Sequence, residues 1–185
     1  MDKGTLLYRR FLDGDQKAFE EIVDLYADNL IFFINRYVKN LSLAEDISED
    51  VFVEVLMHRH RYNFKASFKT YLFAVARHKA LDSLRRLARH PETDYGTIEN
   101  LSGTQSTEEQ FLKQEKLRAM HRCLDTLNDD YKTVLHLIYF EEMSNEDTAK
   151  VMKKSKKQIE NLAYRAKQAL KIAMEKEGYA DEKQR

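Results

Sequence analysis

The residues best suited to bind another molecule lie between positions 58 and 90, where nine Lys or Arg occur with a single acid, Asp82. Flat rings that stack on exposed bases, with cations that contact phosphates, are typical of sites for unpaired nucleic acid, and each stacked base contributes roughly 1–3 kcal/mol. Aromatic residues at helical spacing are equally typical of a core. The rings that alternate with the cations in this segment are Tyr62, Phe64, Phe68, Tyr71 and Phe73.

A second basic segment covers residues 150–174, with eight Lys or Arg and one acid. The whole chain has no net charge, because 31 basic and 31 acidic residues cancel. The charges are nevertheless separated along the chain, whereas i,i+4 pairing on solvated helices would mix the two signs locally. Two separate contacts with a polyanion such as nucleic acid are therefore expected.

Composition favours helices for the elements that position these charges. The 185 residues include five glycines, one proline and no tryptophan, and 34% of them are charged, which suits solvated helices better than strands and tight turns. The lone Cys123 cannot form an intramolecular disulfide. No run of 18 apolar residues and no signal-like amino terminus occurs. We expect an all-α, cytoplasmic protein that does not insert into a membrane.

No catalytic or metal-binding motif is found in the sequence. The chain lacks a Gly-rich nucleotide loop, a Walker loop, His-Glu-x-x-His and a Glu-x-x-His pair. His58, His60, His78 and His90 have no cysteine or acidic companions at a spacing that suits a metal. We therefore expect no enzyme activity, no metal and no cofactor.

Apolar residues recur at three- and four-residue spacing in two stretches, 19–37 and 44–56, which predicts two amphipathic helices. Asp15 is a candidate N-cap for the first helix, and Ser42 and Glu45 have capping-box spacing for the second. The outer face of the second helix is acidic and has no basic residue to neutralise it. This face is either simply solvated or a docking surface for a basic partner. Its acids are Glu45, Asp46, Glu49, Asp50 and Glu54.

Two features complete the first half of the chain. Ser67 is a candidate N-cap for a third helix that begins at Phe68. Residues 91–115 then contain the only proline, two glycines and six acids against one lysine, which predicts an acidic linker between two domains.

The second half predicts a helix-turn-helix motif. Apolar spacing indicates a helix over 117–127, with Cys123 as a small core residue. Asn128 begins the next helix, Ser144 a short one, and Ser155 the last, KKQIENLAYRAKQALKIAM, after a turn at 153–154. Because the last helix carries lysines at its amino end, where the backbone dipole also favours phosphate, a duplex major groove is its natural target.

Three segments in this order resemble the extracytoplasmic-function (ECF) group of the bacterial sigma-70 family of RNA polymerase sigma factors: AEDISEDVF, SFKTYLFAVARHKALDSLRR and LDTLNDDYKTVLHLIYFEEMSNEDTAKVMKKSKKQIENLAYRAKQAL. The resemblance covers nearly the whole chain. It implies two small helical domains and promoter-specific transcription initiation. The implied boundaries are sigma domain 2 at 1–90, a linker at 91–115, sigma domain 4 at 116–176 and a tail at 177–185.

The resemblance also implies partners and site residues. The partners are core RNA polymerase, through the clamp helices of its largest subunit and its flap region, and promoter DNA, with an anti-sigma protein as a further candidate. Docking on the polymerase is implied for Asp46, Glu49, Asp50 and Phe52. Capture and melting of the −10 element are implied for Arg61, Tyr62, Asn63, Phe64, Lys65, Lys69, Tyr71, Arg77, Arg85 and Arg86. Reading of the −35 duplex is implied for Lys156, Lys157, Glu160, Asn161, Tyr164, Arg165 and Lys167.

The sequence departs from the family pattern at the turn of the helix-turn-helix motif, where Lys153 and Lys154 replace the usual Gly and aliphatic residue. A lysine with positive φ is therefore expected there, at a cost of about 1 kcal/mol. Tyr71 also stands where many relatives have Trp, and Ala66 where the loop often has Gly. A dimeric helix-turn-helix repressor of duplex operators is the alternative hypothesis, but it leaves the aromatic residues between 62 and 71 unexplained.

Overall fold

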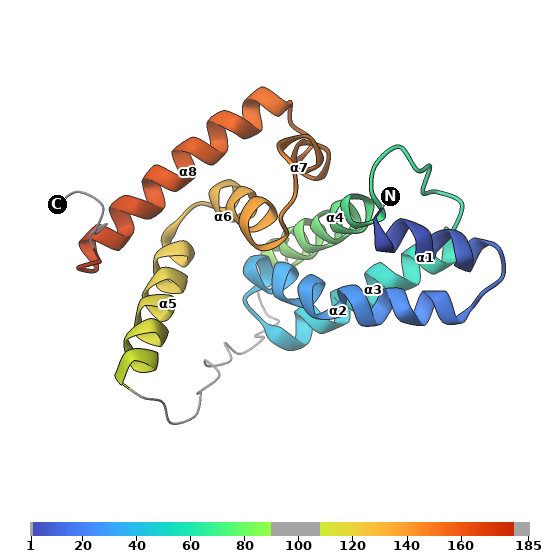
Figure 1. Cartoon of the computed structure of the whole chain (residues 1–185), viewed down its shortest axis with the longest axis horizontal. Coiled ribbons are helices and arrows are strands. Elements are labelled where there is room, and N and C mark those ends of the chain that lie inside the picture. The colour runs from blue at the N-terminus through green and yellow to red at the C-terminus, as the bar shows by residue number, and fades with distance from the viewer. Residues whose placement is uncertain (1, 90–107, 180–185) are drawn as a thin grey trace. The chain divides into compact units, whose positions relative to one another are not determined.

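The computed structural model describes residues 2–89 and 108–179, and all regular elements in these ranges are helices (Figure 1). The predicted all-α class is confirmed. No helix in the described ranges is long and apolar enough to cross a membrane. The elements are α1 (Lys3–Leu12), α2 (Lys17–Val38), α3 (Leu41–Met57), α4 (Phe68–Arg89), α5 (Glu108–Thr126), α6 (Asp129–Leu135), the π-helix η1 (His136–Phe140), α7 (Asn145–Met152) and α8 (Lys156–Lys176).

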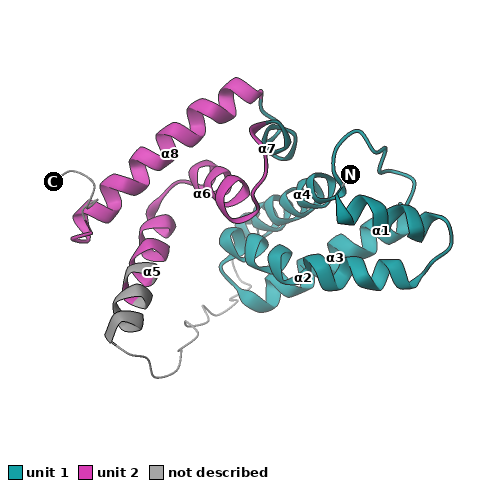
Figure 2. Cartoon of the chain, in the orientation of Figure 1, with its two compact units in different colours: residues 1–98, 146–154 teal, residues 99–145, 155–185 magenta. Residues whose placement is uncertain are grey.

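The chain divides into two compact units, residues 1–98 with 146–154 and residues 99–145 with 155–185 (Figure 2). This division assigns α7 to the first unit, whereas the sequence prediction placed it in the second domain. Helix α5 begins at Glu108, inside the predicted linker at 91–115. The rest of that linker, residues 91–107, lies outside the described residues, as does residue 90. The predicted domain boundaries stay predictions.

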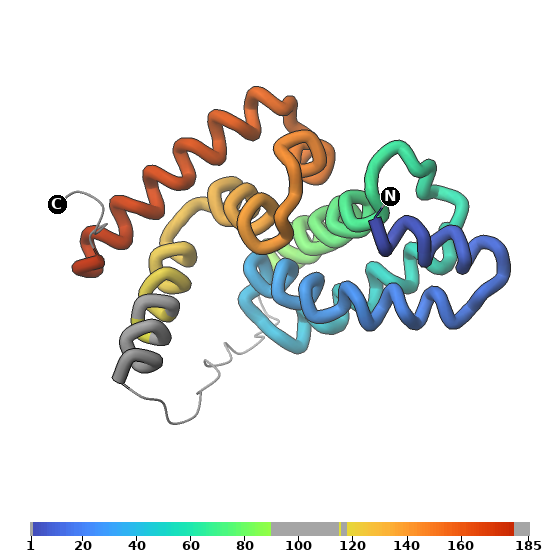
Figure 3. The backbone as a smooth tube through the Cα atoms, viewed as in Figure 1, coloured from blue at the N-terminus to red at the C-terminus, as the bar shows by residue number. Residues whose placement is uncertain are grey.

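Helices α1 to α4 build the first unit around an aromatic and aliphatic core. Figure 3 follows the backbone from α1 into α2 through a turn in which Gly14 has a φ of 104°, a conformation that favours glycine. Gly4 permits the close packing of α1, because a Cβ at this position would lie 2.3 Å from the hydroxyl oxygen of Tyr26. The largest fully buried side chains of this unit are Tyr8, Ile22, Leu30, Phe33, Ile34, Val51, Phe68, Leu72 and Phe73.

Side-chain caps set the beginnings of α3 and α4. The Ser67 hydroxyl accepts the Thr70 N–H at 3.0 Å, so the predicted cap of α4 is confirmed. The capping box predicted at Ser42 is wrong. The Asn40 side chain accepts the Leu43 N–H at 2.9 Å instead, which starts α3 at Leu41.

The second unit is built from α5, α6, η1 and α8. Its described core includes Leu124, Leu137 and Ile159. Cys123 is buried, which confirms it as a core residue, and burial raises the pKa of its thiol, so the reactive thiolate is disfavoured. The predicted cap at Asn128 is confirmed, because its side chain accepts the Tyr131 N–H at 2.9 Å.

The predicted cap of α8 is also confirmed. Ser155 and Gln158 form a reciprocal capping box, which satisfies two backbone N–H groups at the amino end of the helix. Just before it, Lys153 has a φ of 53°, so the lysine with positive φ that the sequence predicted in the turn is present.

Candidate nucleic-acid and polymerase interfaces

The outer face of α3 carries an acidic patch formed by Glu45, Asp46, Glu49 and Asp50. All four side chains are exposed, and none forms an ion pair with another described residue. Unneutralised charges on one helix face produce a local negative potential that attracts a basic partner. The structure thus leaves the three acids predicted to dock on the polymerase available for contact.

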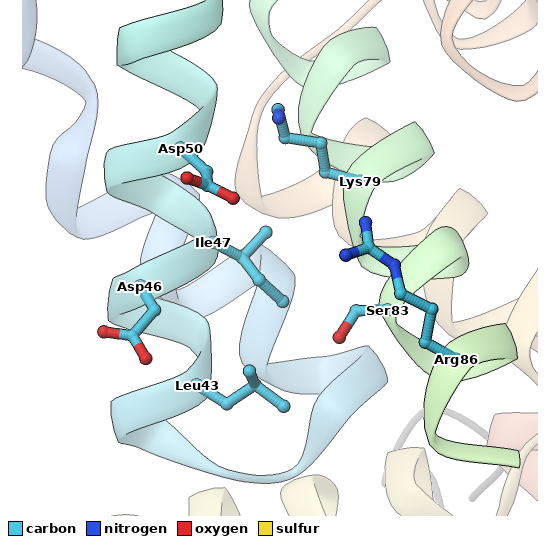
Figure 4. Close-up of a pocket in the computed structure, with 7 residues that line it drawn as sticks. All are labelled: Leu43, Asp46, Ile47, Asp50, Lys79, Ser83 and Arg86. Carbon is cyan, nitrogen blue, oxygen red and sulfur yellow. The ribbon is translucent and has the colours of Figure 1, made fainter. Parts of the chain in front are cut away.

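A shallow groove of about 180 Å³ borders this patch and lies between α3 and α4. Figure 4 shows Ile47 on its α3 side, with Asp50 on the rim of α3 and Lys79 and Arg86 on α4. Arg86, predicted to contact the −10 element, therefore also borders the acidic patch. The groove places opposite charges on its two rims.

Exposed apolar residues continue the acidic patch along α3, a feature that the sequence analysis missed. Val53, Leu56 and Met57 are exposed and follow Glu49 and Asp50 at three- and four-residue spacing. The signal was available for Val53 and Met57, which lie outside the apolar stripe of the helix. Leu56 was counted in that stripe because it follows Phe52 by four residues, and its 43% exposure corrects this prediction. Phe52, which was predicted to contact the polymerase, is instead buried and meets the Phe19 ring edge-on, with centroids 6.4 Å apart.

Glu54, the fifth acid of α3, differs from the patch because it is paired twice. Its carboxylate lies 3.0 Å from Nη1 of Arg61 and 3.0 Å from Nζ of Lys79. Partial burial raises the pKa of Glu54, but the Lys79 ammonium and the Arg61 guanidinium outweigh this effect, so the pKa is lowered overall. Glu54 therefore joins α3 to α4 and to the segment between them.

Most of the predicted stacking rings belong to the core of the first unit. Phe68 and Phe73 are fully buried, and Tyr62 is only 4% exposed. The Tyr62 ring stacks on Tyr71 at 5.2 Å and meets the edge of Tyr8 at 5.4 Å. The core alternative is thus confirmed for Phe68 and Phe73. A base could reach Tyr62 only if its neighbours moved, so its stacking role stays a prediction that this packing does not favour.

The Tyr62 hydroxyl closes the loop formed by residues 62–66. It donates to the Ala66 carbonyl at 2.6 Å and lies 3.2 Å from Oγ1 of Thr5 on α1. The Thr5 hydroxyl also makes a short contact with the Asp2 carboxylate and accepts the Phe68 N–H at 3.0 Å. Because Asp2 and Ala66 offer only acceptors, the two hydroxyl protons serve these two contacts. No proton then remains for a hydrogen bond between the Thr5 and Tyr62 hydroxyls. Thr5 therefore contacts the start of α4 mainly by accepting the Phe68 N–H.

The 62–66 loop exposes one ring and several polar side chains. Phe64 is 37% exposed and has a φ of 61°, in the left-handed region that bulky residues rarely adopt. Asn63 supports this turn by accepting the Lys65 N–H at 3.1 Å. Arg61, Asn63 and Lys65 are exposed, which is compatible with their predicted contact with DNA.

The basic side chains of α4 differ in exposure and in whether a carboxylate already pairs with them. Lys69 lies over the Phe73 ring at 5.8 Å, and both Lys69 and Arg77 are partly buried. Arg85 is exposed but pairs with Asp82 at 2.8 Å. Contact between Arg85 and a phosphate would therefore compete with an internal carboxylate.

Helix α8 presents the whole predicted −35 set at its surface. Ile159 and Ala166 are its buried residues, so the helix packs on that side. Lys167 lies 5.8 Å from the centre of the Tyr139 ring, and Glu160 forms no ion pair within the described residues. The exposed residues are Lys156, Lys157, Glu160, Asn161, Tyr164, Arg165 and Lys167.

In residues 2–89 and 108–179, no three His, Cys, Asp or Glu side chains are grouped as a metal ion requires.

Comparisons with known proteins agree with this arrangement. Residues 22–90 match the Sigma-70 region 2 family, and residues 117–170 match Sigma-70, region 4. The chain is 30% identical over 138 residues to the RNA polymerase sigma factor CarQ of Myxococcus xanthus, covering 75% of this chain and 78% of CarQ. It is 27% identical over 167 residues to the ECF RNA polymerase sigma factor SigX of Bacillus subtilis (strain 168), covering 86% and 85%.

Two solved structures share the fold. CnrH, solved in complex with the cytosolic domain of CnrY, matches with a TM-score of 0.68 and 20% identity, covering 94% of this chain and 98% of that one. The sigma factor RpoE from Bartonella quintana, solved with the anti-sigma factor NepR, matches with a TM-score of 0.67 and 20% identity, covering 86% and 98%. The chain belongs to the ECF group of the sigma-70 family of RNA polymerase sigma factors.

Proposed function

We propose that this sigma factor docks on the clamp helices of core RNA polymerase through the exposed acidic patch of α3. The observation that carries the proposal is that Asp46, Glu49 and Asp50 are exposed and without ion pairs to described residues, whereas Glu54 on the same helix is paired twice. Val53, Leu56 and Met57 add an apolar area to this surface. An acidic rim beside exposed apolar side chains suits a basic, amphipathic helical partner.

We further propose that the 62–66 loop and α4 capture the unpaired −10 strand and that α8 reads the −35 duplex. In the loop, Phe64 is the ring best placed to stack on a base, and Tyr62 supports the loop from within. In α8, lysines at the amino end position the helix on phosphates, while Glu160, Asn161 and Tyr164 lie one to two turns further along. Transcription of this kind places the protein in the cytoplasm.

An anti-sigma protein is a further proposed partner. The support is that RpoE of Bartonella quintana, which has a similar fold, was solved with the anti-sigma factor NepR. The exposed patch of α3 is one surface that such a protein could cover.

Co-elution with bacterial core RNA polymerase, followed by run-off transcription from a library of randomised promoters, tests the proposed function. The full chain should co-elute with core polymerase, and the transcripts should select one pair of −35 and −10 sequences. A dimeric repressor would do neither. A folded protein that fails both assays would overturn the proposal.

A further inference from the structure

Arg9 is an exposed cation beside the 62–66 loop, on a helix that precedes the matched sigma-70 regions. Helix α1 covers residues 3–12, whereas the region 2 match begins at residue 22. The guanidinium carbon of Arg9 lies 5.1 Å from the centroid of the Phe64 ring, within the range of a cation–π contact. Helix α1 therefore contributes a positive charge to the exposed end of the loop.

Phe64 is held at the surface rather than drawn into the core. Its left-handed backbone, with a φ of 61°, is unfavourable for a residue with a Cβ, and such conformations persist where the surrounding structure determines them. Tyr62 packs against it on one side, with ring centroids 4.5 Å apart, and Arg9 lies over its ring. Phe64 as a residue is still 37% exposed.

The positive charge of Arg9 is available to bind a ligand, whereas that of Arg10 is already paired within the protein. Arg10 contacts Asp15 at 2.6 Å and Glu21 at 3.2 Å, and its charge is satisfied within the protein. Arg9 forms no ion pair with any residue in the described ranges. The two adjacent arginines therefore make a matched pair, one free for a ligand and one occupied.

We propose that Arg9 and Phe64 together form a binding site for one unpaired nucleotide of the promoter. On binding, the base takes the face of the Phe64 ring that Arg9 covers in the free protein, and the Arg9 guanidinium, which has no ion pair to hold it, contacts the adjoining phosphate. Stacking on an aromatic ring requires no particular base, and a guanidinium is well suited to a phosphate oxygen. This inference rests on the proposed role of the 62–66 loop in capturing the −10 strand, and it adds a residue that the family match does not include.

The test measures how the holoenzyme binds a fluorescent single-stranded oligonucleotide that carries the −10 sequence obtained from the promoter selection. For single-stranded DNA, each phosphate contact contributes about 0.7 to the slope of log K against log salt. Arg9→Ala should lower the slope by this amount, so the affinity gained when the salt is lowered from 1 M to 0.1 M should be about fivefold smaller than in wild type. Arg10→Ala should leave the slope and the affinity unchanged.

Two further variants sharpen the test. Arg9→Gln keeps a polar side chain of similar reach but removes the charge, so it should reproduce the loss seen in Arg9→Ala and exclude a disturbed fold as its cause. Phe64→Ala should weaken the Arg9→Ala effect, because the two side chains contact the same nucleotide.

The outcomes separate this inference from the proposed function. A wild-type holoenzyme that initiates transcription, with Arg9 variants that bind the oligonucleotide as wild type does, would overturn the Arg9 site alone. Equal losses in Arg9→Ala and Arg10→Ala would also overturn it, because a general charge effect would explain both. A wild-type protein that neither binds core polymerase nor initiates would overturn the proposed function, and the inference with it.

Discussion

The Nζ atom of Lys79 lies 3.0 Å from Oε2 of Glu54, an ion pair that ties α4 to α3. The same carboxylate lies 3.0 Å from Nη1 of Arg61, at the beginning of the segment proposed to bind the −10 strand. The Glu54 carboxylate therefore connects α3, the helix proposed to dock on the polymerase, with α4 and with the segment before the 62–66 loop, which together form the proposed −10 site.

The first prediction is that Glu54→Gln destabilises the first unit by about 1 kcal/mol, which is the upper end of the range for exposed ion pairs. The upper end is expected because Glu54 is only partly exposed and pairs with both Arg61 and Lys79. Glu49→Gln, which removes an unpaired acid from the same helix, should change the free energy of unfolding by less than about 0.5 kcal/mol. Urea unfolding of both variants measures the difference. Equal stabilities would show that the Glu54 pairs contribute nothing.

The effect of Glu54 should also depend on pH. A carboxylate whose pKa is lowered in the folded state stabilises the protein above its unfolded pKa, and this contribution is lost as the pH falls through the folded pKa. The difference between wild type and Glu54→Gln should therefore be complete at neutral pH and should shrink below the ordinary value of 4.5. A difference that grew in acid would contradict this sign.

The second prediction concerns docking on the polymerase. Replacing Asp46, Glu49 and Asp50 together by Lys should abolish co-elution with core polymerase, because the patch changes from acidic to basic. The free energy of unfolding should change little, since exposed unpaired charges contribute little to stability.

The control for this charge reversal is a second acidic set of the same composition. Glu20, Asp24 and Asp28 are exposed on α2 at four-residue spacing and form no ion pair with described residues. Their replacement by Lys alters the net charge equally and should leave co-elution intact. If both triple variants lost the polymerase, net charge rather than the α3 patch would be responsible.

The third prediction concerns Thr5, whose hydroxyl accepts the Phe68 N–H at the start of α4. Thr5→Val keeps the shape of the side chain but leaves this buried N–H without a partner, which costs about 1–3 kcal/mol. Thr5→Ser keeps the hydroxyl and should restore most of the stability. Thermal unfolding measures both variants, and permanganate footprinting of promoter DNA should show reduced opening for Thr5→Val only.

Several elements could be predicted from the sequence because their signals are local. Ser67, Asn128 and Ser155 cap helices as their types and positions predict, since a side-chain oxygen two or three residues from an N–H needs no distant partner. Lys153 adopts the positive φ that its place in the turn predicted. The exposed acids of α3 followed from the periodicity of the apolar residues.

Features that depend on distant contacts could not be predicted in this way. Helix α1 has only ten residues, and its packing depends on Tyr8, which stacks on Phe68 at 4.6 Å, sixty positions away in the chain. The burial of Tyr62 likewise depends on Tyr8 and Tyr71 around it. The sequence pattern of an aromatic residue among cations is the same whether its ring is buried or exposed. The structure is therefore needed to show that, of the two rings in the 62–66 loop, Tyr62 is buried and Phe64 is exposed.

The fourth prediction separates two tyrosines that stack on each other. The Tyr62 hydroxyl donates to the Ala66 carbonyl, whereas the buried Tyr71 hydroxyl has no hydrogen-bond partner among the described residues. Tyr62→Phe should therefore cost about 1 kcal/mol and loosen the 62–66 loop, while Tyr71→Phe should be neutral or slightly stabilising. Urea unfolding measures the stabilities, and amide hydrogen exchange in the loop reports its opening. Faster exchange in Tyr71→Phe than in Tyr62→Phe would reverse the assignment.

The fifth prediction separates positioning from base reading in α8. Lys157, in the first turn, should contact a phosphate, so Lys157→Ala should weaken binding to every −35 duplex alike and lower the salt slope by about 0.9. Lys176 is also exposed but lies about 28 Å further along the helix. Lys176→Ala should leave the slope unchanged, and fluorescence anisotropy across a salt series measures all three proteins.

Glu160, one turn further in from Lys157, is the candidate for base reading. Its carboxylate is exposed and forms no ion pair with described residues, so it is available to accept a hydrogen bond from cytosine N4 in the major groove. One such contact discriminates against a wrong base by about 1–3 kcal/mol. Glu160→Lys should therefore change the preferred base at one −35 position, because a lysine donates to guanine where a glutamate accepts from cytosine. Selection from randomised −35 sequences checks this, and an identical consensus for wild type and Glu160→Lys would identify Glu160 as an ordinary surface residue.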